Sequence, residues 1–186
     1  MVSPVAPASI HRNVPTVESV LHAHASVLGN DFHGYRNHTY RVFNLCVAIQ
    51  PGDGESLERI AVATAFHDLG IWTDGTFDYL APSVQLARAY VTAIGRGAWV
   101  DDVTQMILQH HKLFPSRGAA GPLVEAFRRA DWIDVSRGAL RFGVPRSFVR
   151  ELYSAWPGSG FHRRLVQLSW QRLRTHPLSP LPMVRW

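Results

Sequence analysis

Six side chains that commonly bind metal ions occur within otherwise apolar, helix-like stretches of the sequence. They are His38, His67, Asp68, His110, His111 and Asp131. Imidazole and carboxylate groups are unfavourable in a protein core unless they are hydrogen-bonded, paired or bound to a cation. A single histidine in such a place usually forms a hydrogen bond within the core. Because these residues come from four separate stretches, their convergence on one divalent cation would satisfy all of them together.

The ligand types restrict the metal that this set would bind. Imidazole nitrogen and carboxylate oxygen suit divalent transition metals such as zinc, iron, manganese, nickel and cobalt. We therefore expect one such ion as the cofactor. The alternative for Asp131 is an ordinary ion pair with Arg128 or Arg137, which would need no metal.

Helical periodicity dominates the sequence that must position these residues. His38 shares one helix face with Val42, Leu45 and Ile49, at steps of four, three and four residues. The stretch 57–69 is apolar on all sides, which is typical of a central buried helix. Further helices are predicted over residues 16–28, 83–94, 102–110, 122–135, 146–156 and 159–175. Strand patterns are nearly absent, so we expect an all-α fold, a single compact bundle of about seven to eight helices with the metal site between the central ones.

Length and composition fit one globular domain. The 186 residues are 46% hydrophobic and 18% charged, enough for a single core. We expect a flexible arm at residues 1–15, a domain at 16–176 and a proline-rich tail at 177–186. The sequence has neither a signal-peptide pattern nor an apolar run long enough to cross a membrane, so a cytoplasmic location without membrane contact is expected. The net charge of +5 favours an anionic small-molecule substrate.

The order of the six residues resembles the HD superfamily of metal-dependent phosphohydrolases, which is named for an adjacent His-Asp pair. The resemblance spans residues 30–138 and rests on four motifs, His38-Thr39-Tyr40-Arg41-Val42, His67-Asp68-Leu69-Gly70, His110-His111 and Ala130-Asp131-Trp132-Ile133-Asp134. It implies that His38, His67, Asp68 and Asp131 bind one metal ion. Many members carry a lysine where this chain has Ile71, and members with two metals carry another histidine in the segment 69–109, where this chain has none. A mononuclear site is therefore expected.

The resemblance implies hydrolysis of a phosphomonoester or phosphodiester, such as a nucleotide, by a metal-activated water. Asp68 would be both a metal ligand and the acceptor of a proton from that water. His110 or His111 would stabilise the developing charge or protonate the leaving oxygen, and the sequence does not decide which of the two faces the metal.

Three further residues are candidates for substrate binding. Arg41 lies one turn beyond His38 and would either clamp a phosphate or form a structural salt bridge. Trp72 and Thr73 directly follow the central motif, so they would either overhang the metal and shape selectivity or form a plain turn.

Two other functions remain open at this stage. Small HD proteins include hydratases similar to cyanamide hydratase, in which a metal activates water for addition to a small nitrile. A binding module with a structural metal is the other alternative, with arginines 163, 164, 172 and 174 of the last helix contacting nucleic acid. Those arginines are spread around the helix, so we expect a solvated face and no nucleic-acid partner. A homo-oligomer is compatible with the sequence.

Overall fold

The computed structural model describes residues 9–115, 121–178 and 182–183, and within them the chain is all-α without strands. The α-helices are α1 (Pro15–Ala23), α2 (Ala25–Leu28), α3 (Phe32–Ile49), α4 (Gly54–Phe66), α5 (Gly70–Thr73), α6 (Leu80–Ala93), α7 (Val100–Gln109), α8 (Pro122–Val135), α9 (Arg146–Ala155) and α10 (Phe161–Thr175). Single turns form α2 and α5, and the other eight described helices have nine or more residues. The expected all-α bundle of seven to eight helices is confirmed.

Several helix ends differ from the predicted ones for local reasons. The helix expected over 16–28 is interrupted at His24, where the backbone leaves the helical region and the ring bonds to the Val20 carbonyl. Helix α4 begins before Leu57 because the Asp53 carboxylate accepts a hydrogen bond from the Ser56 backbone N–H, at 2.8 Å, and so caps the helix. It ends at Phe66, and residues 67–69 form a turn.

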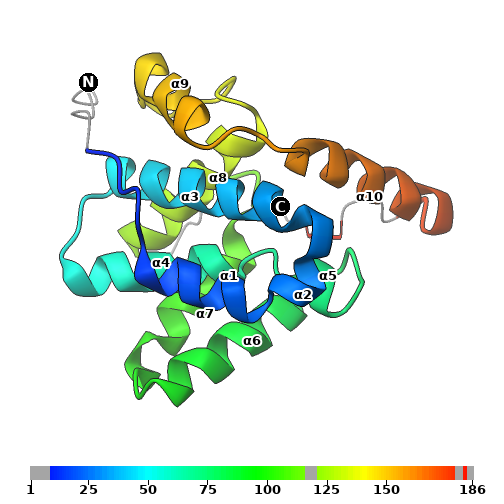
Figure 1. Ribbon diagram of the computed structural model, residues 1–186, viewed down its shortest axis with the longest axis horizontal. Helices are drawn as coiled ribbons and strands as arrows, with labels where there is room; N and C mark the ends of the chain where they lie inside the picture. Colours follow the sequence, from blue (N-terminus) through cyan, green and yellow to red (C-terminus); the bar gives the residue numbers. More distant parts are fainter. Residues whose placement is uncertain (1–8, 116–120, 179–181, 184–186) are drawn as a thin grey trace.

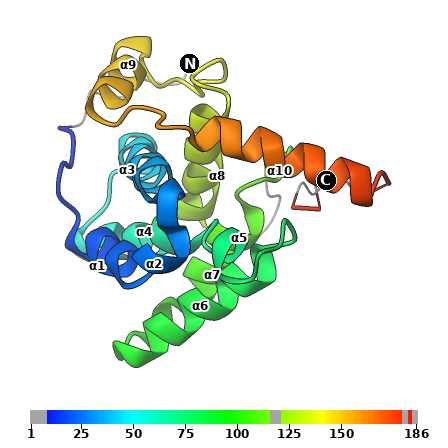
Figure 2. The same ribbon diagram turned by 45° about the vertical axis from the view of Figure 1, so that its right-hand side comes forward.

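The bundle is organised around α3, α4, α7 and α8. Helix α3 packs along α8, α6 along α7, and α1 on α4, while α4 also contacts α3 and α7 (Figures 1 and 2). Residues 60–66 of α4 are all buried, as expected for a central helix. Helix α10 extends beyond the rest of the molecule in both views. No helix among the described residues combines the length and the apolar character needed to cross a membrane.

A glycine on α3 allows the start of α10 to approach closely. A Cβ atom at Gly34 would lie 2.9 Å from the backbone oxygen of Ser159, so a larger residue would displace that segment. The approach brings the Phe161 ring onto the His38 ring, with 4.0 Å between centroids and 16° between planes. The first turn of α10 is thereby packed directly on the helix that carries His38.

The two predicted terminal segments lie partly outside the described residues, namely at 1–8, 179–181 and 184–186. Within the described part of the N-terminal segment, the backbone N–H of His11 donates to the Asn44 side chain at 2.7 Å and Val14 is buried. Near the C-terminus, Met183 is buried against Ile71, Phe77 and other apolar residues.

Candidate metal centre

All six side chains singled out from the sequence converge between α3, α4, α7 and α8. Helices α3 and α8 supply His38 and Asp131, and the turns that follow α4 and α7 supply the two adjacent pairs. Five of the six residues are at most 3% exposed, and the side chain of His111 is 14% exposed. The cluster therefore lies in the core and reaches the surface at His111.

Two histidines of the cluster point their unprotonated nitrogens at each other. His38 Nδ1 lies 2.7 Å from a carboxylate oxygen of Asp134, and His67 Nδ1 lies 2.8 Å from the carbonyl oxygen of Thr64. Because both partners are acceptors, each Nδ1 carries the hydrogen in the neutral imidazole. The two Nε2 atoms are then lone-pair acceptors, yet they lie only 2.9 Å apart. A cation between or beside them would turn this unfavourable contact into ligation.

The carboxylates of the cluster lack hydrogen-bond donors. Among the described residues, Asp68 Oδ1 and both oxygens of Asp131 are buried without a hydrogen-bond partner. Asp68 Oδ2 lies 3.6 Å from His38 Nε2 and 3.4 Å from His67 Nε2, and Asp131 Oδ1 lies 3.6 Å from His38 Nε2. Buried acceptors of this kind are rare unless an ion or water completes the site.

The ion pair considered for Asp131 is not formed with either candidate arginine. Arg128 instead pairs with Glu125, at 2.8 Å, and Arg137 is exposed. The donor set of imidazole nitrogens and carboxylate oxygens thus fits a divalent transition metal.

Both His110 and His111 reach the cluster. His110 Nδ1 lies 2.6 Å from the Ile107 carbonyl, which leaves Nε2 as an acceptor 3.4 Å from Asp68 Oδ1. His111 Nδ1 lies 3.3 Å from Asp131 Oδ2, and its Nε2 lies 2.7 Å from the hydroxyl of Tyr79. Ligand atoms of Asp68, His110 and His111 lie within 4.8 Å of one another, and the same holds for Asp68 with His38 and His67. The two groups share Asp68.

Burial and the neighbouring ionisable groups shift the pKa values of these histidines and carboxylates. Burial, together with the neighbouring imidazoles, lowers the pKa of His67 to about 3. Burial without a donor raises the pKa of Asp131, whereas the imidazoles around Asp68 outweigh burial and lower the pKa of that carboxyl. A neutral His67 beside an ionised Asp68 has the protonation states that metal binding requires. Burial opposes protonation of His110, but its contacts with Asp68 and Asp131 outweigh burial and raise its pKa.

Asp134 and Arg41 form a buried pair behind His38. Arg41 is fully buried, and its guanidinium donates to both carboxylate oxygens of Asp134, at 2.5 and 2.9 Å, and to the carbonyl of Trp156 at 2.8 Å. Despite burial, this pairing lowers the pKa of Asp134. The ionised carboxylate in turn orients His38. Arg41 thus forms a structural salt bridge with Asp134, as in the second alternative considered for it.

Trp72 and Thr73 are held by local contacts in and around α5. The Trp72 indole N–H donates to Asp31 at 2.9 Å, its ring lies 4.8 Å from that of Tyr35, and the Thr73 hydroxyl donates to Asp74 at 2.8 Å. Neither residue lines the cavity beside His111. These contacts match the alternative of a turn with a packed tryptophan, and a role of Trp72 and Thr73 in substrate binding stays a prediction.

A cavity of about 630 Å³ borders the cluster at His111, and we call it the metal-side cavity. Tyr79 and Trp132 line it near His111, and His162 lines its opposite part. The sequence analysis identified neither Tyr79, whose hydroxyl contacts His111, nor His162 as residues near the cluster. Tyr79 can approach Gly70 closely because glycine has no side chain. A Cβ atom at Gly70 would lie 2.6 Å from the Tyr79 carbonyl oxygen.

Comparison with known proteins gives one family match. The family model of the HD domain matches residues 35–136, more than half of the chain, and this range includes all six cluster residues. No curated protein and no solved structure matches the chain significantly.

Proposed function

This chain belongs to the HD domain family, and from this membership we propose that it is a metal-dependent hydrolase of phosphate esters. The observation that carries the proposal is the contact between the two acceptor nitrogens of His38 and His67, beside buried carboxylate oxygens that have no donor in the described structure. A divalent cation is the group that satisfies both kinds of ligand. HD domains are generally metal-dependent hydrolases, so the reaction class follows from the family.

In this proposal His38, His67, Asp68 and Asp131 hold one metal ion. A metal held by these residues would supply Lewis-acid polarisation of a phosphoryl oxygen and would lower the pKa of a bound water. Asp68 Oδ1 has no donor in the described structure, so it is placed to accept the proton of the attacking water. Asp134 keeps His38 in the ligating tautomer through its contact with Nδ1.

His110 and His111 then act on the phosphate side of the reaction. His110 Nε2 lies next to Asp68 Oδ1, where it can take up or return a proton. His111 is the partly exposed member of the cluster and lines the metal-side cavity, so it is placed to contact the substrate. The Tyr79 hydroxyl fixes the ring of His111.

The cavity favours a phosphate ester over a small nitrile. Its volume of about 630 Å³ falls within the range typical of small-molecule sites and far exceeds what a molecule of a few atoms fills. Arg137 and Arg163 also line it, which suits an anionic ligand. Access of His111 to this cavity likewise favours a reactive site over a purely structural metal.

Elemental analysis of the purified protein tests the proposal. We expect about one equivalent of a divalent transition metal in the wild type and its loss in Asp68→Ala, whereas Asp78→Ala, at an exposed carboxylate, should keep it. The metal-loaded wild type is then assayed on nucleoside monophosphates, cyclic nucleotides and small nitriles. Metal that remains in Asp68→Ala would contradict the assigned ligands, and turnover of nitriles alone would contradict the phosphate-ester assignment.

A further inference from the structure

A second cavity lies directly beside the metal-side cavity. This outer cavity of about 490 Å³ is formed by Arg137 in the turn after α8, by α9, by the segment 158–160 and by the first turn of α10. None of the six cluster residues lines it, but it shares Arg137, His162 and Arg163 with the metal-side cavity. These three residues therefore form the boundary between the two spaces.

The metal-side cavity is largely aromatic and aliphatic between His111 and this boundary. Its apolar lining includes Phe77, Tyr79, Trp132, Leu165, Val166 and Met183. Such a surface suits the organic part of a ligand, since apolar area removed from water favours binding and aromatic rings stack on one another. A phosphate held at the metal centre would leave the rest of its molecule in this space.

The boundary itself is positively charged. Neither Arg137 nor Arg163 has an ion pair or a side-chain hydrogen bond with another described residue, and both are exposed. By contrast, Arg164 next in sequence pairs with Asp31 at 3.1 Å. Two guanidinium groups without a carboxylate partner on the wall of a cavity are suited to bind an anionic group of a ligand.

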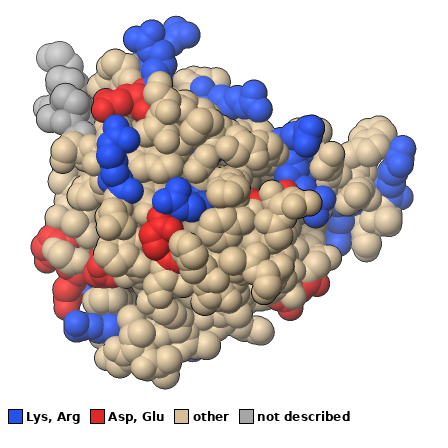
Figure 3. Space-filling view, in the orientation of Figure 1, with Lys and Arg blue, Asp and Glu red and all other residues tan. Residues whose placement is uncertain are grey.

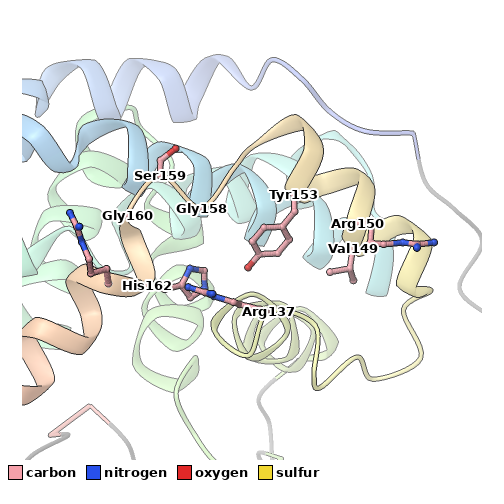
Figure 4. Close-up of a pocket in the computed structure, with 9 residues that line it drawn as sticks. Arg137, Val149, Arg150, Tyr153, Gly158, Ser159, Gly160 and His162 are labelled. Carbon is pink, nitrogen blue, oxygen red and sulfur yellow. The ribbon is translucent and has the colours of Figure 1, made fainter.

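The backbone fixes the position of this boundary. The carbonyl oxygen of Asp134 accepts hydrogen bonds from the Arg137 N–H at 2.9 Å, from the Tyr153 hydroxyl at 3.0 Å and from His162 Nε2 at 3.0 Å. Figure 4 shows Arg137 reaching toward His162 below Tyr153, whereas Arg150 extends away from them. Basic side chains gather over α9 and α10 on the face seen in Figure 3. The backbone of Arg137 is thus held in place by a hydrogen bond, whereas the side chain of Arg150 points away from the boundary.

We propose that the substrate is a phosphate ester whose organic part, aromatic or otherwise apolar, fills the metal-side cavity and which carries a second anionic group bound by Arg137 and Arg163. The position of the reacting phosphate rests on the proposed function. The binding of the second anionic group rests only on the two cavities and the two arginines.

Calorimetric titration with two matched nucleotides tests this inference. Adenosine 5′-monophosphate carries an aromatic base and one phosphate, and adenosine 3′,5′-bisphosphate adds a second, separate phosphate. Both are titrated into the full-length protein as purified and after chelation, where no turnover occurs. We expect the bisphosphate to bind about tenfold more tightly, because one or two charge-assisted hydrogen bonds are added. Ribose 5-phosphate, which lacks the base, should bind more weakly than either.

Arginine variants identify the group responsible. In Arg137→Gln and Arg163→Gln the preference for the bisphosphate should fall to about threefold or less, and the corresponding lysine variants should restore part of it. Arg88→Gln on α6 removes the same charge from an exposed position outside both cavities and should keep the full preference.

The outcomes separate this inference from the proposed function. Equal affinity for the two nucleotides, no binding of either, or an unchanged preference in both glutamine variants would overturn the inference, even if the protein hydrolyses phosphate esters. An arginine-dependent preference after chelation would support it, even if no hydrolysis is found.

Discussion

Replacing Asp131 with asparagine should affect the metal-free and metal-loaded protein in opposite ways. Without metal, the Asp131 carboxylate is buried with no hydrogen-bond donor among the described residues. Its Oδ1 lies 3.6 Å from His38 Nε2, which is an acceptor in the neutral ring. An asparagine amide is neutral and can donate to that nitrogen, so at a pH above the raised pKa of Asp131 the substitution removes an unfavourable buried charge.

The structure sets the expected size of the two effects. An unsatisfied buried polar group costs about 1–3 kcal/mol, and more if charged, so Asp131→Asn should raise the free energy of unfolding of the metal-free protein by at least about 1 kcal/mol. For a chain of this size that corresponds to roughly 2–4 °C in Tm. With metal at 100 times its Kd, the wild type should gain about 2.7 kcal/mol. If losing a ligand weakens binding about 100-fold, the variant gains only about 0.4 kcal/mol at the same concentration.

Thermal unfolding followed by circular dichroism, with chelator and with added metal, measures both effects. Asp78→Asn is the matched control, because it removes the same charge at an exposed position outside the cluster. We expect the control to shift Tm equally in both conditions and to keep the metal-induced gain of the wild type.

Two results would refute this reasoning. One is a metal-free Asp131→Asn protein that melts below the wild type, which would mean that the carboxylate is stabilised where it lies. The other is an equal metal-induced rise in Tm for the wild type and the variant, which would mean that Asp131 is not a ligand.

Two further substitutions probe the residues around the cluster. Asp134→Asn should weaken metal binding by about 10- to 100-fold in calorimetric titration, because His38 loses the carboxylate that fixes its tautomer; unchanged affinity would contradict this orienting role. Glu18→Gln should lower the free energy of unfolding at neutral pH by about 1–3 kcal/mol, because Arg36 and Tyr40 donate to the carboxylate. Partial burial opposes ionisation, but these donors outweigh it and lower the pKa of Glu18, so the stabilisation is present above the usual glutamate range and is lost as the pH falls through the lowered value. Urea unfolding across this range should show the difference between the two proteins shrinking in acid, and a constant difference would exclude an ionic origin.

The helices could be predicted because the residues of each packing face recur at helical spacing along the sequence. The stripe from His38 to Ile49 marked α3, and the uniformly apolar stretch marked α4 as central. Their exact ends depended on single caps such as Asp53, which periodicity does not show. No pattern in the loop between α5 and α6 indicated that Tyr79, at its end, contacts His111.

The convergence of the six side chains could be predicted because a polar residue on an apolar stripe needs an explanation, but their hydrogen-bond partners could not. Adjacent residues on an α-helix point about 100° apart, so only one of His110 and His111 was expected to face inward. The helix ends at Gln109, and the following turn lets both rings reach the cluster. The role of Arg41 depended on where α8 places Asp134, 93 positions later in the chain, which no local pattern contains.

The stacking of Phe161 on His38 connects the cavity boundary to the candidate metal centre. The first turn of α10 carries both Arg163, at the cavity boundary, and Phe161, which packs on the His38 ring. This turn can approach α3 closely because Gly34 has no side chain. Under the proposed function, a ligand held by Arg163 would therefore contact the same helical turn that packs on His38, one of the proposed metal ligands.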